Sequence, residues 1–122
     1  MIIKKKNLAI LGSTGSIGTQ ALEVVAEHPS LFDVEVLTAN ENVSLLLKQA
    51  KKFKPNVVVI KNKEKYNTLN SALFSLGIKV FCGESSLEDV VEMESVDLVL
   101  NALVGYSGLK PTIRAIKSKK TI

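Results

Sequence analysis

Three glycines spaced three residues apart follow a short apolar segment near the start of the chain. Residues 8–18 read L-A-I-L-G-S-T-G-S-I-G. The glycines at 12, 15 and 18 would let the backbone turn sharply and approach a pyrophosphate with no Cβ in between. A helix that begins there would present unpaired N–H groups and a partial positive charge to the same anion. This spacing predicts nucleotide binding through phosphates. The alternative is an ordinary strand-to-helix turn that happens to be rich in glycine.

The segments around these glycines have the patterns that such a site needs. The apolar run at 8–11 predicts a strand, and residues 16–27 predict a helix that Pro29 ends. Apolar residues recur at helical spacing along this helix, at Ile17, Ala21, Val24 and Val25. We therefore expect a strand, a glycine turn and a helix in direct succession.

Strands and helices alternate along the rest of the chain. Strands are predicted at 32–38, 57–60, 78–81 and 96–103, and Thr121 with Ile122 would begin another. Helices are predicted at 43–53 with Asn42 as its cap, at 64–76 closed by Gly77, and at 86–93 with Ser85 or Ser86 as its cap. A last helix has Pro111 in its first turn and ends near residue 118.

This alternation predicts the fold class. Apolar strands separated by helices indicate an α/β domain with a doubly wound, mainly parallel, Rossmann-like sheet, formed as a single domain by residues 1–122. Ligands of such sheets bind beyond the carboxyl ends of the strands, where the strand order reverses. Three loops should meet there, at 12–18, 39–42 and 104–108.

Composition narrows the classes of function. The chain has 122 residues, of which 46% are hydrophobic and 23% charged, with a net charge of +4. Aromatic residues are too few to supply base-stacking platforms, so we expect no nucleic acid partner, and no apolar run approaches a membrane span. The one cysteine, Cys82, is expected in the core and fits a reducing compartment, the cytoplasm. His28 is expected at the surface, and no cluster of residues has metal-ligand spacing.

The letters of several segments resemble one enzyme family. Residues 12–25 read G-S-T-G-S-I-G-T-Q-A-L-E-V-V, and residues 102–112 match a family stretch of the form A-x-V-G-x-x-G-L-x-P-T. Matches also occur at Asn42-Val43, Lys54-Pro55 and Asp97, and at the end in Ala115-Ile116 and Lys120-Thr121-Ile122. Along essentially its whole length the chain resembles the 1-deoxy-D-xylulose 5-phosphate reductoisomerase family.

The resemblance implies an amino-terminal domain that binds NADPH. The full enzyme is an NADPH-dependent oxidoreductase that converts 1-deoxy-D-xylulose 5-phosphate to 2-C-methyl-D-erythritol 4-phosphate in non-mevalonate isoprenoid biosynthesis. Family members continue into an A-N-K-E-type segment and a catalytic domain that binds Mg or Mn, and the full-length protein is expected to be a homodimer. The resemblance places no catalytic residue and no metal ligand in these 122 residues, so we expect them to be inactive by themselves.

The cofactor-binding residues that the resemblance implies form three groups, one on each loop. The phosphate group is Gly12, Thr14, Gly15, Ser16, Ile17 and Gly18; the adenosine ribose group is Ala39, Asn40, Glu41 and Asn42; the nicotinamide group is Ala102, Leu103, Val104 and Gly105.

One residue departs from the family pattern. Many members have Lys or Arg at the position of Glu41, where a cation meets the 2′-phosphate. A carboxylate at the end of the second strand more often accepts a hydrogen bond from the ribose 2′-OH of NAD. Glu41 could instead face solvent, with Asn40, Asn42 and Ser44 donating hydrogen bonds to the phosphate. We expect NADPH to bind at least as well as NADH.

Two other classes of protein have to be weighed. Dehydrogenases of the aspartate-semialdehyde type share a G-x-x-G-x-x-G turn, but the G-L-x-P-T stretch is not expected in them. A regulatory module that senses nucleotide without catalysis would share the fold, although this chain has no DNA-reading helix pattern. An A-N-K-E-type sequence encoded directly after Ile122 would favour the reductoisomerase.

Overall fold

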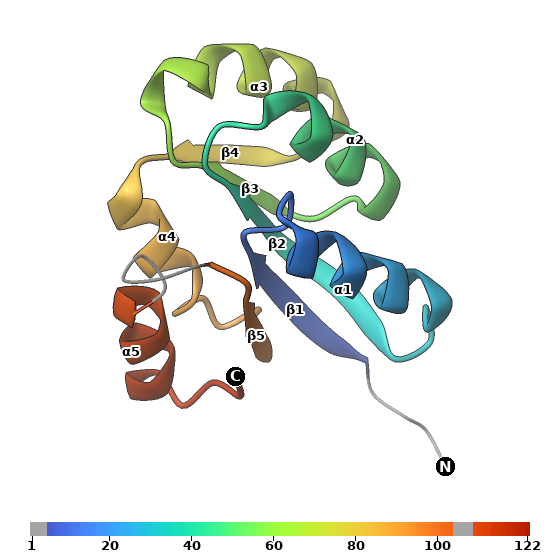
Figure 1. Ribbon diagram of the computed structural model, residues 1–122, viewed down its shortest axis with the longest axis vertical. Coiled ribbons are helices and arrows are strands. Elements are labelled where there is room, and N and C mark those ends of the chain that lie inside the picture. Colours follow the sequence, from blue (N-terminus) through green and yellow to red (C-terminus); the bar gives the residue numbers. More distant parts are fainter. Residues whose placement is uncertain (1–4, 104–108) are drawn as a thin grey trace.

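A parallel sheet of five strands forms the centre of the computed structural model, which describes residues 5–103 and 109–122. In the described ranges the sheet order is β4-β3-β2-β1-β5, and every neighbouring pair is parallel (Figure 1). The strands are β1 (Lys6–Leu11), β2 (Phe32–Ala39), β3 (Val57–Ile60), β4 (Lys79–Cys82) and β5 (Leu98–Asn101). The predicted Rossmann-like α/β fold is thus confirmed.

Helices cover both faces of the sheet. The helices α1 (Ser16–Glu27), α2 (Val43–Phe53) and α3 (Tyr66–Leu73) lie on one face, and α4 (Glu84–Val90) and α5 (Leu109–Lys117) lie on the other (Figure 1). The chain adds strands outward from β1 to β4 and then returns through α4 to place β5 on the other side of β1. The strand order therefore reverses between β1 and β5, which is where ligands of open α/β sheets bind.

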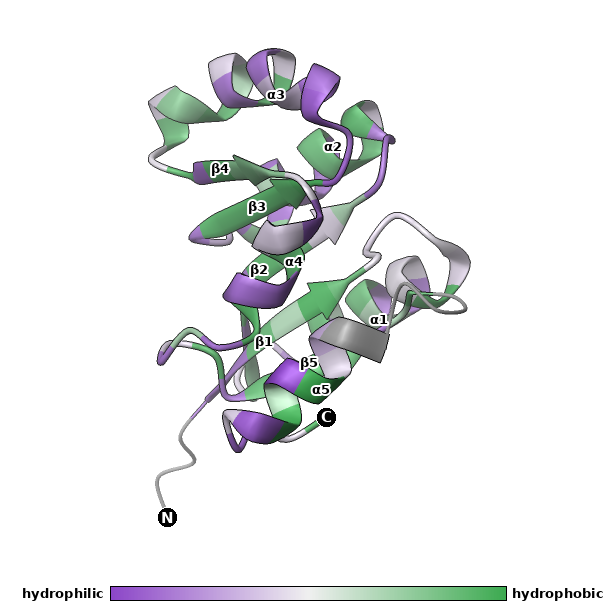
Figure 2. Cartoon of the chain, turned by 90° about the vertical axis from the view of Figure 1, so that its left-hand side faces the viewer, coloured by the Kyte–Doolittle hydropathy of each residue, from purple (hydrophilic) through white to green (hydrophobic). Residues whose placement is uncertain are grey.

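The core consists of two apolar layers, one on each face of the sheet. Successive residues of β3 point to opposite faces, so Val58 and Ile60 pack under α1–α3 whereas Val57 and Val59 pack under α4 and α5. All four are buried, which explains the continuous β-branched run of this strand. In Figure 2 the strands are coloured mainly hydrophobic, whereas hydrophobic and hydrophilic residues mix along the helices.

Several predicted helix ends are confirmed. The Asn42 side chain accepts a hydrogen bond from the Leu45 backbone N–H at 3.1 Å and caps α2. This helix ends at Phe53, and its C-cap residue Lys54 has a left-handed φ of 51° directly before Pro55. Gly77 adopts a φ of 73° and closes the following helical segment. These caps supply partners for backbone groups that the helix itself leaves unpaired.

The apolar residues that predicted α1 do not all face the sheet, although Val25 is buried. Ile17 and Val24 are exposed by 62% and 53%, and the buried residues of this helix are Gly18, Leu22 and Val25. Gly18 lies against the turn before the helix. Because of this contact, Leu22 and Val25, four and seven residues later, face the sheet. Apolar spacing alone could not reveal this contact.

Two other helices and two strands also differ from the predictions. Residues 64–76, predicted as one helix, form a 3₁₀ turn η1 (Lys63–Lys65), then α3, then a second 3₁₀ turn η2 (Phe74–Leu76). Helix α4 begins at Glu84 after Gly83, not at a serine cap, because the Ser86 hydroxyl donates to the Cys82 carbonyl. Strand β5 is shorter than the predicted 96–103, and β4 lies one residue later than predicted.

The end of the chain returns to the sheet. Thr121 forms a parallel bridge with Leu98, and the Thr121 carbonyl accepts a hydrogen bond from the Val99 N–H at 2.7 Å. The predicted strand opening at Thr121 therefore lies beside β5. Cys82 is partly buried against the core layer under α1–α3, and His28 is exposed at the end of α1, both as expected. No helix in the described ranges is long and apolar enough to cross a membrane.

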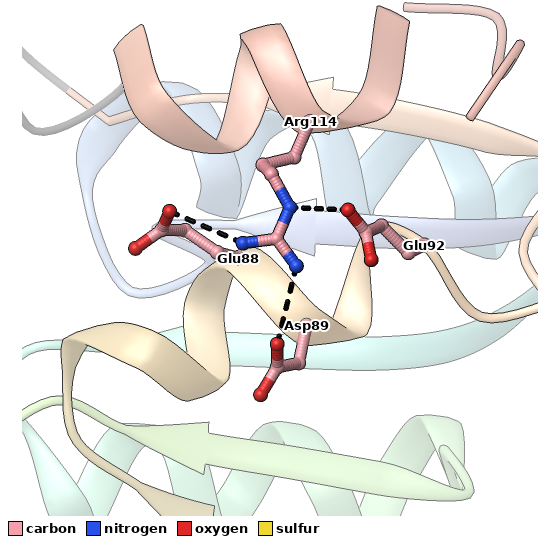
Figure 3. A network of polar contacts seen from close by, with 4 residues as sticks. All are labelled: Glu88, Asp89, Glu92 and Arg114. Carbon is pink, nitrogen blue, oxygen red and sulfur yellow. Dashed lines mark hydrogen bonds and ion pairs between the residues drawn. The ribbon is translucent and has the colours of Figure 1, made fainter. Parts of the chain in front are cut away.

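An arginine joins the two helices of the second face. Arg114 of α5 lies 3.3 Å from both Glu88 and Asp89 of α4, and its Nε donates to Glu92 (Figure 3). The hydrogen bond from Arg114 lowers the pKa of Glu92, and the same bond raises the pKa of Arg114. The group is partly solvent-exposed, so it positions α5 against α4 with a strength that depends on salt.

We expect Arg114→Met to lower the melting temperature at neutral pH and low salt, because three carboxylates lose their common partner. The hydrogen bond from Arg114 makes the pKa of Glu92 lower in the folded chain. The stability that this pair contributes is therefore present above the ordinary pKa of 4.5 and is lost as pH falls through the lower folded pKa. Melting curves recorded at several pH values and salt concentrations should show that the difference in melting temperature between wild type and Arg114→Met becomes smaller in acid and in high salt. Lys5→Met, which removes one exposed pair with Asp33, is the control. A difference independent of pH and salt would instead indicate packing of the arginine stem.

Candidate functional site

The loop between β1 and α1 forms a compact turn at the reversal of strand order. Gly12 has a φ of 78°, which a residue with a side chain rarely adopts. The Gly15 N–H donates to the Gly12 carbonyl at 3.2 Å, and Gly15 then begins α1 with an extended backbone. The predicted glycine turn is therefore present between a strand and a helix.

The three glycines of this loop meet different surroundings. A Cβ on Gly18 would lie 2.2 Å from the Gly12 carbonyl oxygen and 2.7 Å from Ser13 Cα, so only glycine allows α1 to approach the turn. A Cβ on Gly12 would lie 3.2 Å from the Ala102 carbonyl oxygen, in addition to the positive φ. Among the described residues, a Cβ on Gly15 would meet only the Gly12 oxygen, at 3.6 Å, an ordinary contact. The fold thus requires glycine at 12 and 18, whereas at 15 the part of the chain that the structure describes leaves room for a side chain.

The start of α1 is suited to an anion. Gly15 provides no side-chain cap, and no acidic residue lies in the first turn of this helix of 12 residues. The first N–H groups of the helix and the positive end of its dipole therefore face outward beside Ser16 and Ile17, both of which are exposed. Thr14 is partly buried and stands directly before this turn.

A buried polar contact fixes the loop to its neighbours. The Ser13 N–H donates to the Thr38 carbonyl at 2.8 Å, and the Gly12 N–H donates to the Thr38 hydroxyl at 3.0 Å. The Gln49 side-chain amide of α2 donates to the Ser13 carbonyl at 2.8 Å, and its oxygen lies 2.7 Å from the Ser13 hydroxyl. All three side chains are buried, so the loop is held by β2 and α2 through satisfied hydrogen bonds.

The segment after β5 touches the glycine loop. The Ala102 N–H donates to the Leu11 carbonyl at 2.9 Å, and the Leu103 side chain lies over Gly12. The Asn101 side chain accepts from the Leu103 N–H at 3.1 Å and donates to the Thr112 hydroxyl at 2.5 Å, which ties this segment to α5. Ala102 and Leu103 are partly buried here. Val104 and Gly105, and the rest of the loop at 104–108, lie outside the described residues.

The segment after β2 lies at the same carboxyl edge of the sheet. Ala39 is buried, and Asn40, Glu41 and Asn42 are exposed. The Asn42 side-chain oxygen is used as the cap of α2. Glu41 Oε1 instead accepts a hydrogen bond from the Asn62 side chain, at 3.3 Å.

A hollow of about 410 Å³ lies between this segment and the residues after β3. It is lined by Asn40, Glu41, Lys61 and Asn62. The structure therefore places two of the three predicted groups, and the first two residues of the third, at one edge of the sheet.

Sequence patterns missed the residues that support this edge. Gln49 could have been noticed, because it is a polar residue three positions after Leu46 on the apolar face of a helix. Such a position usually requires a buried partner. Lys61 and Asn62 follow β3 and carry no signal that separates them from other surface residues.

The fold and the glycine turn define a Rossmann-like α/β domain, and comparisons with known proteins give its family. The family model for 1-deoxy-D-xylulose 5-phosphate reductoisomerase matches residues 8–122. The reductoisomerase of Bacteroides thetaiotaomicron is 60% identical over 119 residues, which are 98% of this chain and 30% of that protein. That of Porphyromonas gingivalis is 54% identical over 118 residues, which are 97% of this chain and 31% of that protein.

Solved structures agree with these matches. The reductoisomerase of Zymomonas mobilis, determined in complex with NADPH, superposes with a TM-score of 0.90 at 32% identity, over 96% of this chain and 31% of that one. A reductoisomerase in complex with NADPH, fosmidomycin and magnesium gives a TM-score of 0.89 at 32% identity, over 94% and 28% of the two chains. The chain therefore belongs to the 1-deoxy-D-xylulose 5-phosphate reductoisomerase family, and it spans about 30% of the length of its curated relatives. The semialdehyde dehydrogenase and the regulatory module are not favoured.

The contrast between Gly15 and Gly18 can be tested directly. Gly15→Val should leave the melting temperature nearly unchanged, because the backbone is extended and the site is open. It should weaken binding of a nucleotide phosphate at this turn at least tenfold, about 1.4 kcal/mol, by placing a branched side chain where the phosphate would approach. Gly18→Ala should instead lower the free energy of unfolding by about 1–3 kcal/mol through overpacking. Calorimetric titration and denaturant melts of both variants measure the two effects. Unchanged affinity in a folded Gly15→Val chain would remove this loop from the binding site.

Proposed function

We propose that this chain is the NADPH-binding domain of a 1-deoxy-D-xylulose 5-phosphate reductoisomerase. The observation that supports this most directly is the open backbone at Gly15, at the start of α1 and at the reversal of strand order. A turn whose other two glycines serve packing, and whose middle glycine meets no described residue closer than an ordinary contact where its side chain would stand, suits the close approach of a pyrophosphate. The match to relatives determined with NADPH supports the choice of cofactor.

The residues at this edge fit a dinucleotide. The backbone N–H groups of Gly15, Ser16 and Ile17 would bind the phosphates, with hydroxyl groups from Thr14 and Ser16. The segment from Ala39 to Asn42 would lie at the adenosine ribose. Ala102 to Gly105 would line the nicotinamide side. When bound, NADPH supplies the hydride for the reduction.

The residues of this chain bind and orient the cofactor in this proposal, and the chemistry on the sugar phosphate belongs to other parts of the full-length enzyme. In the described ranges, no group of three or more His, Cys, Asp or Glu side chains could hold a metal ion. The magnesium in the related structures would then correspond to a site formed outside this segment. We assign the conversion of 1-deoxy-D-xylulose 5-phosphate to 2-C-methyl-D-erythritol 4-phosphate, in isoprenoid biosynthesis, to the full-length protein.

We further propose that the full-length protein is a cytoplasmic homodimer. The single cysteine of these 122 residues supports a reducing compartment, since within them it has no partner for a disulfide. The dimer rests on the family resemblance.

Binding of NADPH is the direct test of the proposed function. The 122-residue chain should bind NADPH saturably with one site per chain in a calorimetric titration, and its melting temperature should rise with NADPH concentration. Gly15→Val serves as the control for binding outside the glycine loop. Absence of binding to folded chain at millimolar cofactor would contradict the proposal.

The division between binding and chemistry has its own test. The purified 122-residue chain should oxidise no NADPH above a blank when mixed with 1-deoxy-D-xylulose 5-phosphate and Mg²⁺ or Mn²⁺, as followed by absorbance of the reduced nicotinamide. A full-length relative is the positive control. Turnover by the 122 residues would show that the reacting groups lie within this segment.

A further inference from the structure

We infer that Lys61, at the carboxyl end of β3, is the cation that recognises the 2′-phosphate of NADPH in this chain. This residue would make the site prefer NADPH over NADH, although Glu41 occupies the loop after β2. The inference rests on the proposed function, because it assigns one contact within the NADPH site.

Backbone hydrogen bonds place Lys61 beside the ribose segment. The Lys61 N–H donates to the Ala39 carbonyl at 2.9 Å, and the Asn62 N–H donates to the Asn40 carbonyl at 3.0 Å. The pairing of β2 with β3 thus continues past the last residues of both strands. Lys61 is held at a fixed register next to the residues that would meet the adenosine ribose.

The hollow at this edge contains both a cation and an acid. Its lining residues are Asn40, Glu41, Lys61 and Asn62. Lys61 has no ion-pair partner among the residues that the structure describes. Its charge is therefore available to an anion that enters the hollow, and an ammonium group binds phosphate oxygens as a mobile point charge.

A hydrogen-bond chain holds the acid of this hollow. Asn62 donates from its side-chain nitrogen to Glu41 Oε1 at 3.3 Å, and its side-chain oxygen accepts from the Glu64 N–H at 3.0 Å. The Asn62 amide is thereby fixed at both ends, and it draws the Glu41 carboxylate toward η1. The Glu41 carboxylate repels a phosphate, since both groups are negative. The hydrogen bond from the Asn62 side chain gives this carboxylate a partner within the chain.

The other lysines near this edge are directed elsewhere. The Lys63 side chain lies over Gly83, with its Cε 2.9 Å from where a Cβ of that glycine would be. Lys48 and Lys52 line a separate cleft between α1 and α2. Lys61 is the lysine that lines the hollow, so the inference concerns its position and not the net charge of the chain.

The test compares two cofactors that differ only in the 2′-phosphate. NADPH and NADH are titrated calorimetrically against wild-type chain, Lys61→Met, Lys61→Arg and the matched control Lys63→Met. We expect Lys61→Met to weaken NADPH about tenfold, the range for a lost hydrogen bond to a charged group, and to change NADH less than twofold. Lys61→Arg should retain the preference for NADPH, and Lys63→Met should behave as wild type. Adenosine 2′,5′-bisphosphate, titrated in the same way, should follow NADPH.

The outcomes separate this inference from the proposed function. Wild-type chain that binds neither cofactor contradicts the proposed function and the inference with it. Wild-type chain that binds NADPH, with equal NADPH affinity in a folded Lys61→Met variant, overturns the inference alone. Equal losses for NADPH in Lys61→Met and Lys63→Met would also overturn it, because they would show a response to overall charge. Melting curves of each variant establish that it is folded, which is expected because the Lys61 side chain makes no hydrogen bond or ion pair with the described residues.

Discussion

The close approach of α1 to the turn before it determines the geometry of the proposed nucleotide site. Gly18 lies so near the Gly12 carbonyl that a single methyl group would overlap it at 2.2 Å. This contact sets the rotation of α1, which places Leu22 and Val25 in the core and leaves Ile17 exposed beside the helix start. It also aims the free N–H groups of the first turn toward the carboxyl edge of the sheet. Packing and the proposed anion site therefore share one cause.

Buried hydrogen bonds make this turn rigid without a ligand. Ser13 is completely buried between Thr38 of β2 and Gln49 of α2, and each of these side chains has partners in the structure. Opening the turn would leave polar groups of all three residues unpaired in the core, which costs more than an exposed contact of the same kind. A cofactor would consequently meet a surface already in its binding shape and would lose less free energy to ordering.

Local patterns were sufficient for the parts of this fold that local physics decides. The glycine turn, the Asn42 cap, the four buried residues of β3 and the stop at Gly77 all follow from neighbouring residues. The rotation of α1, the division of 63–76 into three helical pieces and the start of α4 at Glu84 do not, because contacts with distant residues decide them. At the site, the residues of the glycine loop were predictable from spacing. Gln49 could have been noticed as a polar residue on the apolar face of its helix, but its partner Ser13 could not. Lys61 carried no signal, since only the sheet topology places it beside the residues after β2.

In many dinucleotide sites the loop after β2 has two functions, and the sheet topology of this chain allows them to be divided between two loops. That loop commonly both shapes the ribose pocket and selects between a 2′-hydroxyl and a 2′-phosphate. Here Asn42 is committed to capping α2, and Glu41 is held by Asn62 from the neighbouring loop. Because parallel strands end at one edge, the residues after β3 stand next to those after β2 and can provide a charge that the first loop lacks. An acid after β2 is therefore not sufficient evidence for NAD specificity in a parallel sheet. The sign of the charge has to be judged over both loops that border the ribose pocket.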